Sequence, residues 1–153
     1  MSDEGRLLEP GLHGFDDVAA GDRIETDATI VSAKAIDAFA ALTGDRFAIH
    51  MSDTAAQELG FPSRVAHGLL VLSLIDGLKN QCPAQFRAVA SLGWDMRFSR
   101  PVLAGDRIHG RLKVTEKRLI SDGKRGILTL NVEAVNQTGE VVQSGLNRLM
   151  VER

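Results

Sequence analysis

The chain has 153 residues, of which 44% are hydrophobic and 25% charged, a composition typical of a globular protein that can bury a core. Its formal net charge of −2 excludes the strongly basic balance of proteins that bind nucleic acids or anionic membranes. Residues 1–5 are acidic and polar and lack the features of a secretory signal. A single cysteine, Cys82, excludes an internal disulfide framework. We therefore expect one cytoplasmic domain over residues 1–153, without nucleic-acid or membrane partners.

The first third of the chain predicts an arm, a strand and a short helix. Residues 1–20 show little periodicity and are expected to form an N-terminal arm. Alternation over residues 22–30 predicts a half-buried strand with these inward positions: Ile24, Thr26, Ala28, Ile30. Ser32 is a suitable N-cap for a helix that ends at Gly44. The apolar face of that helix would hold Ile36, Phe39 and Ala40, with Leu42 close by.

Two further helices are expected before residue 80. Residues 53–59 fit a short helix that begins at Ser52 or Asp53, and residues 60–63 have the composition of a turn. Residues 65–78 carry apolar side chains around nearly the whole circumference of a helix, which predicts a buried central helix. The same segment is too short and too polar to span a bilayer.

The remainder of the chain, from about residue 88, alternates with the period of a strand. The inward positions fall in three clear sets: Ala90, Leu92, Trp94, Met96, Phe98; Ile108, Gly110, Leu112, Val114; Leu128, Leu130, Val132, Ala134. A less regular strand follows over residues 141–151. Together these strands predict a four-strand antiparallel meander, and the fold class is α+β, a long central helix wrapped by a curved antiparallel sheet.

An acid and an imidazole, Asp45 and His50, lie five residues apart after Gly44. On a loop, that spacing can bring a carboxylate and a histidine to one small molecule, and histidine exchanges protons near neutral pH. The alternative interpretation is that Asp45 caps a turn and His50 is an ordinary surface residue.

The segment Ala66-His67-Gly68 precedes the apolar helix. A glycine at a helix start leaves its backbone N–H unobstructed, and the helix dipole adds positive character there, so this N–H can stabilise an oxyanion. Alternatively, Gly68 only permits close packing and His67 is a partly buried core residue.

Three other features of the sequence bear on its chemistry. Asp76 is an acid inside the apolar helix; because an unpaired buried carboxylate is costly, we expect water or a partner beside it. Cys82 follows that helix beside Pro83, where a packing role is expected rather than nucleophilic catalysis. The four histidines show no metal-ligand spacing, so no metal is expected.

Four segments together carry a family resemblance. Residues 39–50 read FAALTGDRFAIH, residues 65–70 VAHGLL, residues 98–106 FSRPVLAGD and residues 136–140 NQTGE. In this order they resemble the MaoC-like, R-specific enoyl-CoA hydratase family over most of residues 15–150. The resemblance implies a hot-dog fold and a homodimer whose two sheets are joined, with active sites near the subunit interface.

The resemblance also implies a reaction and its residues. Asp45 and His50 would activate one water for syn addition to a trans-2-enoyl thioester, which gives an (R)-3-hydroxyacyl thioester of coenzyme A. The Gly68 N–H, beside Ala66 and His67, would bind the thioester oxygen. Coenzyme A would be part of the substrate, and no cofactor or metal is implied.

The chain departs from the family's motif at Phe47 and Ala48, where the motif has Asn and Pro. Phe47 would then narrow the acyl pocket, and Asp76 falls where relatives carry a small hydroxyl residue near the site. Two alternatives stay open: a thioesterase that uses Asp76, and a non-catalytic module that binds acyl thioesters. Candidate contacts to the coenzyme phosphates are Arg64, Arg87, Arg97 and Arg100.

Overall fold

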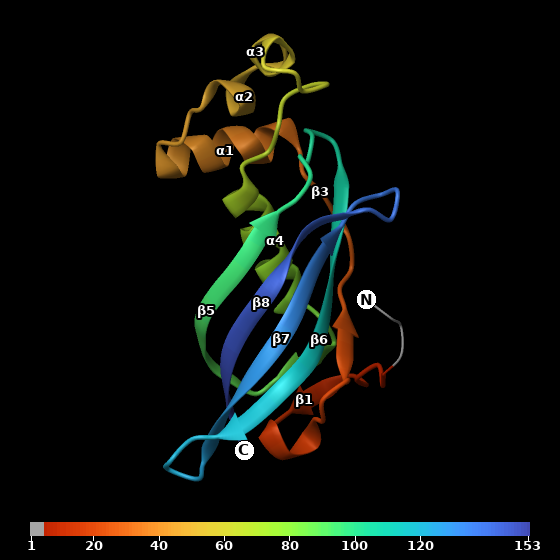
Figure 1. The fold of residues 1–153 in the computed structure, drawn as a ribbon, viewed down its shortest axis with the longest axis vertical. Coiled ribbons are helices and arrows are strands. Elements are labelled where there is room, and N and C mark those ends of the chain that lie inside the picture. The colour runs from red at the N-terminus through yellow and green to blue at the C-terminus, as the bar shows by residue number, and fades with distance from the viewer. Residues whose placement is uncertain (1–4) are drawn as a thin grey trace.

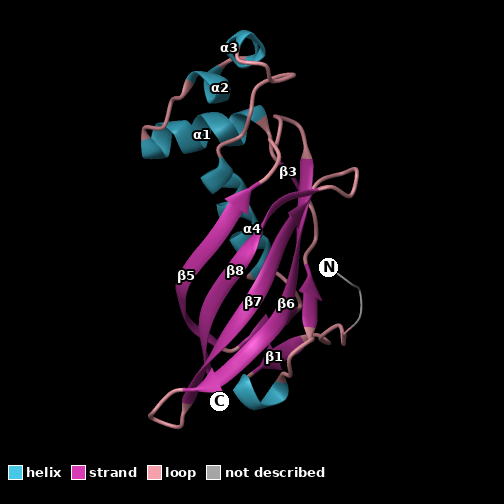
Figure 2. Ribbon diagram, viewed as in Figure 1, coloured by secondary structure: helices cyan, strands magenta, loops and turns pink. Residues whose placement is uncertain are grey.

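The computed structural model describes residues 5–153, in which helix α4 (Gly68–Lys79) lies against one face of a curved antiparallel sheet (Figures 1 and 2). The strands of this sheet follow the order β2-β6-β7-β8-β5, and β3 pairs with β6 beside β2. Their bounds are β2 Arg23–Glu25, β3 Thr29–Ile30, β5 Ala88–Phe98, β6 Arg107–Leu119, β7 Arg125–Val135 and β8 Val141–Glu152. The expected α+β class, a central helix wrapped by a curved sheet, is confirmed.

The order of the strands differs from the expected meander. β6, β7 and β8 are consecutive antiparallel neighbours, joined by the turns after residues 119 and 135. β5 does not lie beside β6; it pairs with β8 at the opposite edge, so residues 99–106 cross over to reach β6. The prediction of a simple four-strand meander was therefore wrong, because alternation specifies the face of a side chain and not the neighbour of a strand.

The core lies between α4 and the concave face of the sheet. Leu70, Val71 and Ile75 of α4 are buried, and so are all the inward positions predicted for β6 and β7. Burial of each Val, Leu or Ile side chain in this set stabilises the fold by about 1.5–3 kcal/mol. The prediction that α4 is buried all round was wrong: Leu69 is 61% exposed and Ser73 is exposed.

The strand predictions failed at two edges. Ala90, Leu92 and Phe98 of β5 are exposed. Register shifts between Ala88 and Ala90 and between Ser91 and Gly93 interrupt the alternation, and one edge of β5 has no neighbour in the described sheet. The strand expected over residues 22–30 is divided into β2 and β3, and Ile30 is exposed.

The N-terminal arm packs on the core along residues 5–20; residues 1–4 lie outside the described residues. β1 (Gly11–His13) pairs in parallel with β4 (Ala84–Phe86), which the sequence did not predict, and a short 3-10 helix, η1 (Phe15–Asp17), follows. Arm side chains that are buried in the core are Leu8, Phe15 and Val18. Cys82 is also buried, which raises the pKa of its thiol.

Three short helices cluster beyond one end of the sheet (Figure 1): α1 (Ala33–Thr43), α2 (Ala48–Met51) and α3 (Asp53–Glu58). The predicted caps of α1 are confirmed, since Ser32 Oγ accepts the Ala35 N–H at 3.0 Å and Gly44 adopts φ 81°. Leu42, however, is exposed rather than packed. Among residues 5–153, no helix is long and apolar enough to cross a membrane.

Candidate active site

The end of α1 positions Asp45. Gly44 adopts a left-handed conformation and its N–H donates to the Ala40 carbonyl at 2.8 Å, which turns the chain away from the helix. The Asp45 N–H donates to Thr43 Oγ1 at 3.2 Å, and Asp45 Oδ1 accepts the Phe47 N–H at 3.3 Å. This Asx-type turn holds the carboxylate at the entrance to α2.

Helix α2 carries His50, where the sequence predicted only a loop. His50 is buried, and its Nδ1 lies 2.7 Å from the Val65 carbonyl oxygen. Because a carbonyl oxygen only accepts hydrogen bonds, Nδ1 must carry the proton, and Nε2 of the neutral ring keeps a free lone pair. The Val65 N–H donates back to Ile49 at 2.8 Å, so residues 49–50 and 65 are tied together. His50 is therefore held in the tautomer that a general base requires.

Arg64 ties the three small helices to the segment that precedes α4. Its Nε donates to the His50 carbonyl, its Nη2 donates to the Asp37 carboxylate, and its backbone N–H donates to Asp53 Oδ1 at 2.9 Å. The guanidinium is mostly buried by these contacts. Arg64 was a candidate contact to the coenzyme phosphates; its hydrogen bonds instead assign it to holding the backbone of His50.

The start of α4 supplies a free backbone donor. The side chain of the N-cap residue, His67, makes no capping hydrogen bond, and no acceptor for the Gly68 N–H exists in the described chain. The first N–H groups of a helix carry partial positive charge. A Cβ at Gly68 would lie 2.3 Å from two ring atoms of Phe98, so glycine lets that ring lie directly against the start of α4. The N–H of Gly68 is thus available to an anionic oxygen.

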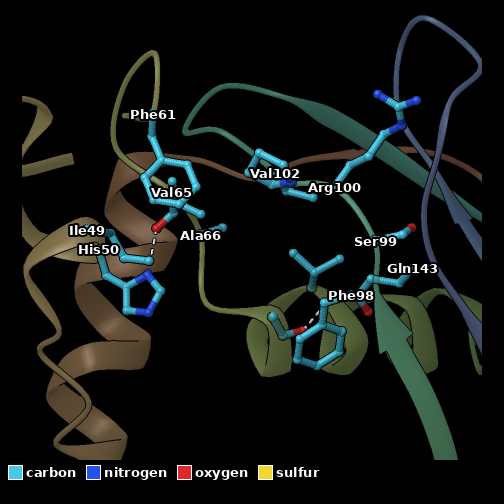
Figure 3. Close-up of a pocket in the computed structure, with 13 residues that line it drawn as sticks. Ile49, His50, Phe61, Val65, Ala66, Phe98, Ser99, Arg100, Val102 and Gln143 are labelled. Atoms are coloured by element: carbon cyan, nitrogen blue, oxygen red, sulfur yellow. Dashed lines mark hydrogen bonds between the residues drawn. The ribbon is translucent and has the colours of Figure 1, made fainter. Parts of the chain in front are cut away.

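His50 and Gly68 line one cavity of about 390 Å³ (Figure 3). Most of its wall is apolar, with polar contributions from His50, Ser99, Arg100 and Gln143. His50 and Gln143 lie on opposite sides of the cavity in Figure 3. Ala66 also lines it, and its N–H donates to the Val102 carbonyl at 2.7 Å. The cavity can therefore hold an apolar molecule between a base and a helix N-terminus.

His67 lies beside His50 and does not line the cavity. Its ring stacks on that of His50 with centroids 3.9 Å apart, and its Nε2 lies 2.8 Å from the Asp45 carbonyl oxygen. His67 is 2% exposed, and its Nδ1 has no hydrogen-bond partner. Asp45 also stays outside the cavity lining, although its carboxylate lies within 4.8 Å of ring nitrogens of both histidines.

Phe47 and Asp76 are not brought to this cavity. The Phe47 ring is 71% exposed and stacks at 6.2 Å from His50, so it covers that histidine from outside instead of narrowing the pocket. Asp76 lies eight residues along α4 from Gly68, and its Oδ1 is 2.9 Å from Lys79 Nζ. The expected partner of the acid is therefore a lysine on the same helix.

The cluster of Asp45, His50 and His67 has the composition of a metal site, but its geometry disfavours one. A metal ion lies in the ring plane of each histidine that binds it, about 2.0–2.1 Å from the nitrogen for zinc. The two rings are stacked with planes only 27° apart. Ring planes at this angle intersect much farther from the nitrogens than a zinc–nitrogen bond length. The two histidines therefore cannot bind the same ion in this arrangement. That no metal is used stays a prediction.

Sequence reasoning missed Gln143, a buried amide that lines the cavity from β8. Its Nε2 donates to the Gly68 carbonyl at 2.8 Å. The only available signal was the irregular pattern of residues 141–151, where amides interrupt the apolar positions.

Comparison with known proteins gives a consistent result. The family model described as "MaoC like domain" matches residues 17–136. The (R)-specific enoyl-CoA hydratase of Aeromonas caviae is 30% identical over 110 residues, which cover 72% of this chain and 78% of that protein. The beta-methylmalyl-CoA dehydratase of Chloroflexus aurantiacus is 34% identical over 116 residues, or 75% of this chain. The chain spans only 33% of the length of that relative.

Solved structures agree. A monoamine oxidase regulatory protein from Archaeoglobus fulgius superposes with a TM-score of 0.86 at 31% identity, and the match covers 95% of this chain and 99% of the other. A Mycobacterium tuberculosis protein with a double hot-dog fold matches 91% of this chain and 44% of its own at a TM-score of 0.76 and 24% identity. The expected hot-dog fold is therefore confirmed. By its sequence and its fold, the chain belongs to the MaoC-like domain family.

Proposed function

We propose that this protein is a hydratase or dehydratase that adds water to a trans-2-enoyl-CoA thioester to give an (R)-3-hydroxyacyl-CoA, or catalyses the reverse. The observation that carries the proposal is that His50, whose Nδ1 is held by the Val65 carbonyl, and Gly68, whose N–H is free, line the same apolar cavity. Hydration of an enoyl thioester requires a base for water and a donor for the carbonyl oxygen. The names of the Aeromonas and Chloroflexus relatives support the same class of reaction.

His50 is the base in this proposal. As the water oxygen bonds to the β-carbon, Nε2 accepts one of its protons. The hydrogen bond from Nδ1 to the Val65 carbonyl stabilises the imidazolium that forms, because the protonated ring is the stronger donor. Water is a weak nucleophile, and a positioned base of this kind contributes about 10²–10⁴-fold to the rate.

Gly68 stabilises the charge that develops at the other end of the conjugated system. Attack at the β-carbon moves electrons onto the thioester oxygen, which becomes enolate-like. The N–H of Gly68 would donate to that oxygen, and the dipole of the 12-residue helix α4 adds to the effect. Both contributions grow as the charge develops, so they lower the barrier rather than only strengthening substrate binding.

Asp45 completes the movement of protons. The α-carbon takes one proton as the enolate collapses, so the net change is the addition of H and OH to the double bond. We assign delivery of that proton to Asp45, whose carboxylate lies within 4.8 Å of a His50 nitrogen. Asp45 first receives from His50 the proton that His50 took from the water and then passes it to the α-carbon, so both side chains regain their starting states. The reaction uses no cofactor, and coenzyme A enters as part of the substrate.

A homodimer is part of the proposal. β5 ends the order of the sheet, and three of its apolar side chains are exposed: Val89, Leu92 and Phe98. Leu69 of α4 is exposed as well, next in sequence to Gly68. Pairing of β5 with β5 of a second copy would continue the sheet and cover this surface (Figure 1). The substrate cavity would then lie near the subunit interface.

One assay tests the proposed reaction. The protein is incubated with crotonyl-CoA while the enoyl absorbance and the release of free thiol are followed together. Loss of absorbance without thiol release supports a hydratase, and thiol release would instead indicate a thioesterase. Absence of both, with measurable binding, would indicate a non-catalytic module. No structural observation favours the thioesterase, since Asp76 is paired with Lys79 and does not line the cavity.

A further inference from the structure

Gln143 presents an unused hydrogen-bond acceptor beside the start of α4. The residue is 2% exposed and lines the cavity that also holds His50 and Gly68. Its Nε2 donates to the Gly68 carbonyl at 2.8 Å, whereas its Oε1 is buried without any partner among the described residues. Leaving a buried amide oxygen without a hydrogen bond is destabilising, so its retention calls for a partner that arrives with a ligand.

The orientation of the amide follows from its surroundings. The Gly68 carbonyl oxygen can only accept, so the atom of Gln143 that faces it must be the NH₂ group. Oε1 is then the atom that remains free to accept a hydrogen bond. The start of α4 and the neighbouring strand β8 therefore offer two complementary groups to one molecule in the cavity, the free N–H of Gly68 and the free oxygen of Gln143.

The proposed reaction determines which part of the substrate reaches Gln143. With the thioester oxygen at the Gly68 N–H, the β-carbon must face His50, because that side chain activates the water. The sulfur is bonded to the opposite side of the same carbonyl carbon and points away from His50. Gln143 lies across the cavity from His50 (Figure 3), on the side of the sulfur. The first hydrogen-bond donor beyond the sulfur is the amide N–H two carbons further along the pantetheine arm.

We propose that Oε1 of Gln143 accepts a hydrogen bond from this first amide N–H of the pantetheine arm. Gln143 would thereby bind the thioester arm with its oxygen and hold the Gly68 turn with its nitrogen, so that the arm and the oxyanion donor are aligned by a single side chain. The inference rests on the proposed function, and its test is arranged to separate the two.

The test compares two small thioesters of crotonic acid that differ in a single group. One is the N-acetylcysteamine thioester, which contains the amide N–H. The other is the thioester of 2-mercaptoethyl acetate, in which an ester oxygen replaces that N–H at nearly the same size. We expect the wild-type protein to hydrate the amide substrate with a kcat/KM about tenfold higher, since the ester leaves Oε1 without a donor.

Variants then assign the preference to Gln143. Gln143→Met keeps the length of the side chain and removes the acceptor, and it should lower the ratio of the two kcat/KM values to about one. Ser99→Ala is the matched control, because Ser99 lines the same cavity but its hydroxyl donates to the Val142 carbonyl at 3.1 Å. It should retain the tenfold ratio. Thermal unfolding verifies that each variant is folded.

The outcomes are distinct. A wild-type ratio near one overturns the inference even if the protein is an active hydratase, and so does a tenfold ratio that persists in Gln143→Met. Should the Met variant fail to fold, Gln143→Asn replaces it, since the shorter amide withdraws the acceptor and should also abolish the preference. Failure to hydrate either thioester or crotonyl-CoA would instead overturn the proposed function itself.

Discussion

The imidazole rings of His50 and His67 stack with centroids 3.9 Å apart and planes 27° apart. Each ring donates its one proton to a backbone carbonyl: that of Val65 for His50, and that of Asp45 for His67. The pair therefore joins α2, the loop that bears Asp45 and the start of α4 in one buried unit.

The proposed acid–base pair is tested by Asp45→Asn and His50→Ala. Each should lower kcat/KM for crotonyl-CoA hydration by about 10²–10⁴-fold, the usual contribution of a positioned proton-transfer group. His109→Ala is the control, because it removes a histidine of β6 that does not line the cavity. Wild-type rates in both site variants would contradict the assignment.

The bond from His67 to the Asp45 carbonyl predicts a positioning role. His67→Phe keeps an aromatic ring for stacking on His50 but cannot donate to that carbonyl. We expect kcat/KM to fall by about tenfold, with a smaller fall in His67→Gln, which retains a donor. Steady-state kinetics and thermal unfolding on both variants separate loss of alignment from loss of stability. Equal activity of the two would indicate that the hydrogen bond has no role in positioning.

Sequence reasoning succeeded where a local rule decides the structure. Ser32 and Gly44 delimit α1 because capping depends on a few adjacent residues. The inward positions of β6 and β7 were correct because these strands lie inside the sheet with one face on the core. His50 and Gly68 were singled out from their residue types and spacing; they line one cavity, and their catalytic roles stay a prediction.

Three of the misses depend on contacts between distant segments. α2 has four residues, too few for a helical period, and it is held by Val65 and Arg64 from further along the chain. The position of β5 beside β8 is a choice of neighbour that alternation does not encode. Gln143 has no motif, and its relation to Gly68 joins residues 75 positions apart.

The close approach of Phe98 to Gly68 predicts a steric effect with a rescue. In Gly68→Ala the new methyl group would lie 2.3 Å from the Phe98 ring, so the ring or the first turn of α4 must move. We expect kcat/KM to fall by about 10²-fold, the usual loss when one oxyanion donor is displaced. Phe98→Ala opens the space, and the double variant should recover part of the loss relative to Phe98→Ala alone. A double variant in which the two losses simply add would show that the ring is not the cause.

The arm that precedes β2 predicts a specific response to acid. The Asp22 carboxylate is buried, which by itself raises its pKa, but hydrogen bonds from Arg6 at 2.7 and 3.2 Å and from the Ala19 N–H at 2.8 Å bring the net pKa below the ordinary value of 3.8. A carboxyl whose pKa is lower in the folded state stabilises the fold above its unfolded pKa. That contribution is lost as the pH falls from about 4 toward the folded value.

Asp22→Asn should therefore lower the free energy of unfolding at pH 7 by about 1–3 kcal/mol, since a buried hydrogen-bonded charge is lost. It should also flatten the dependence of that free energy on pH between about 5 and 3, measured by urea unfolding. Asp16→Asn is the control, because its ion pair with Arg153 is exposed and should contribute less than about 1 kcal/mol. Parallel pH profiles for the wild type and Asp22→Asn would show that the Arg6–Asp22 pair does not cause the loss of stability in acid. A flattened profile for Asp22→Asn would assign that loss to this pair, which lies where the arm joins the sheet.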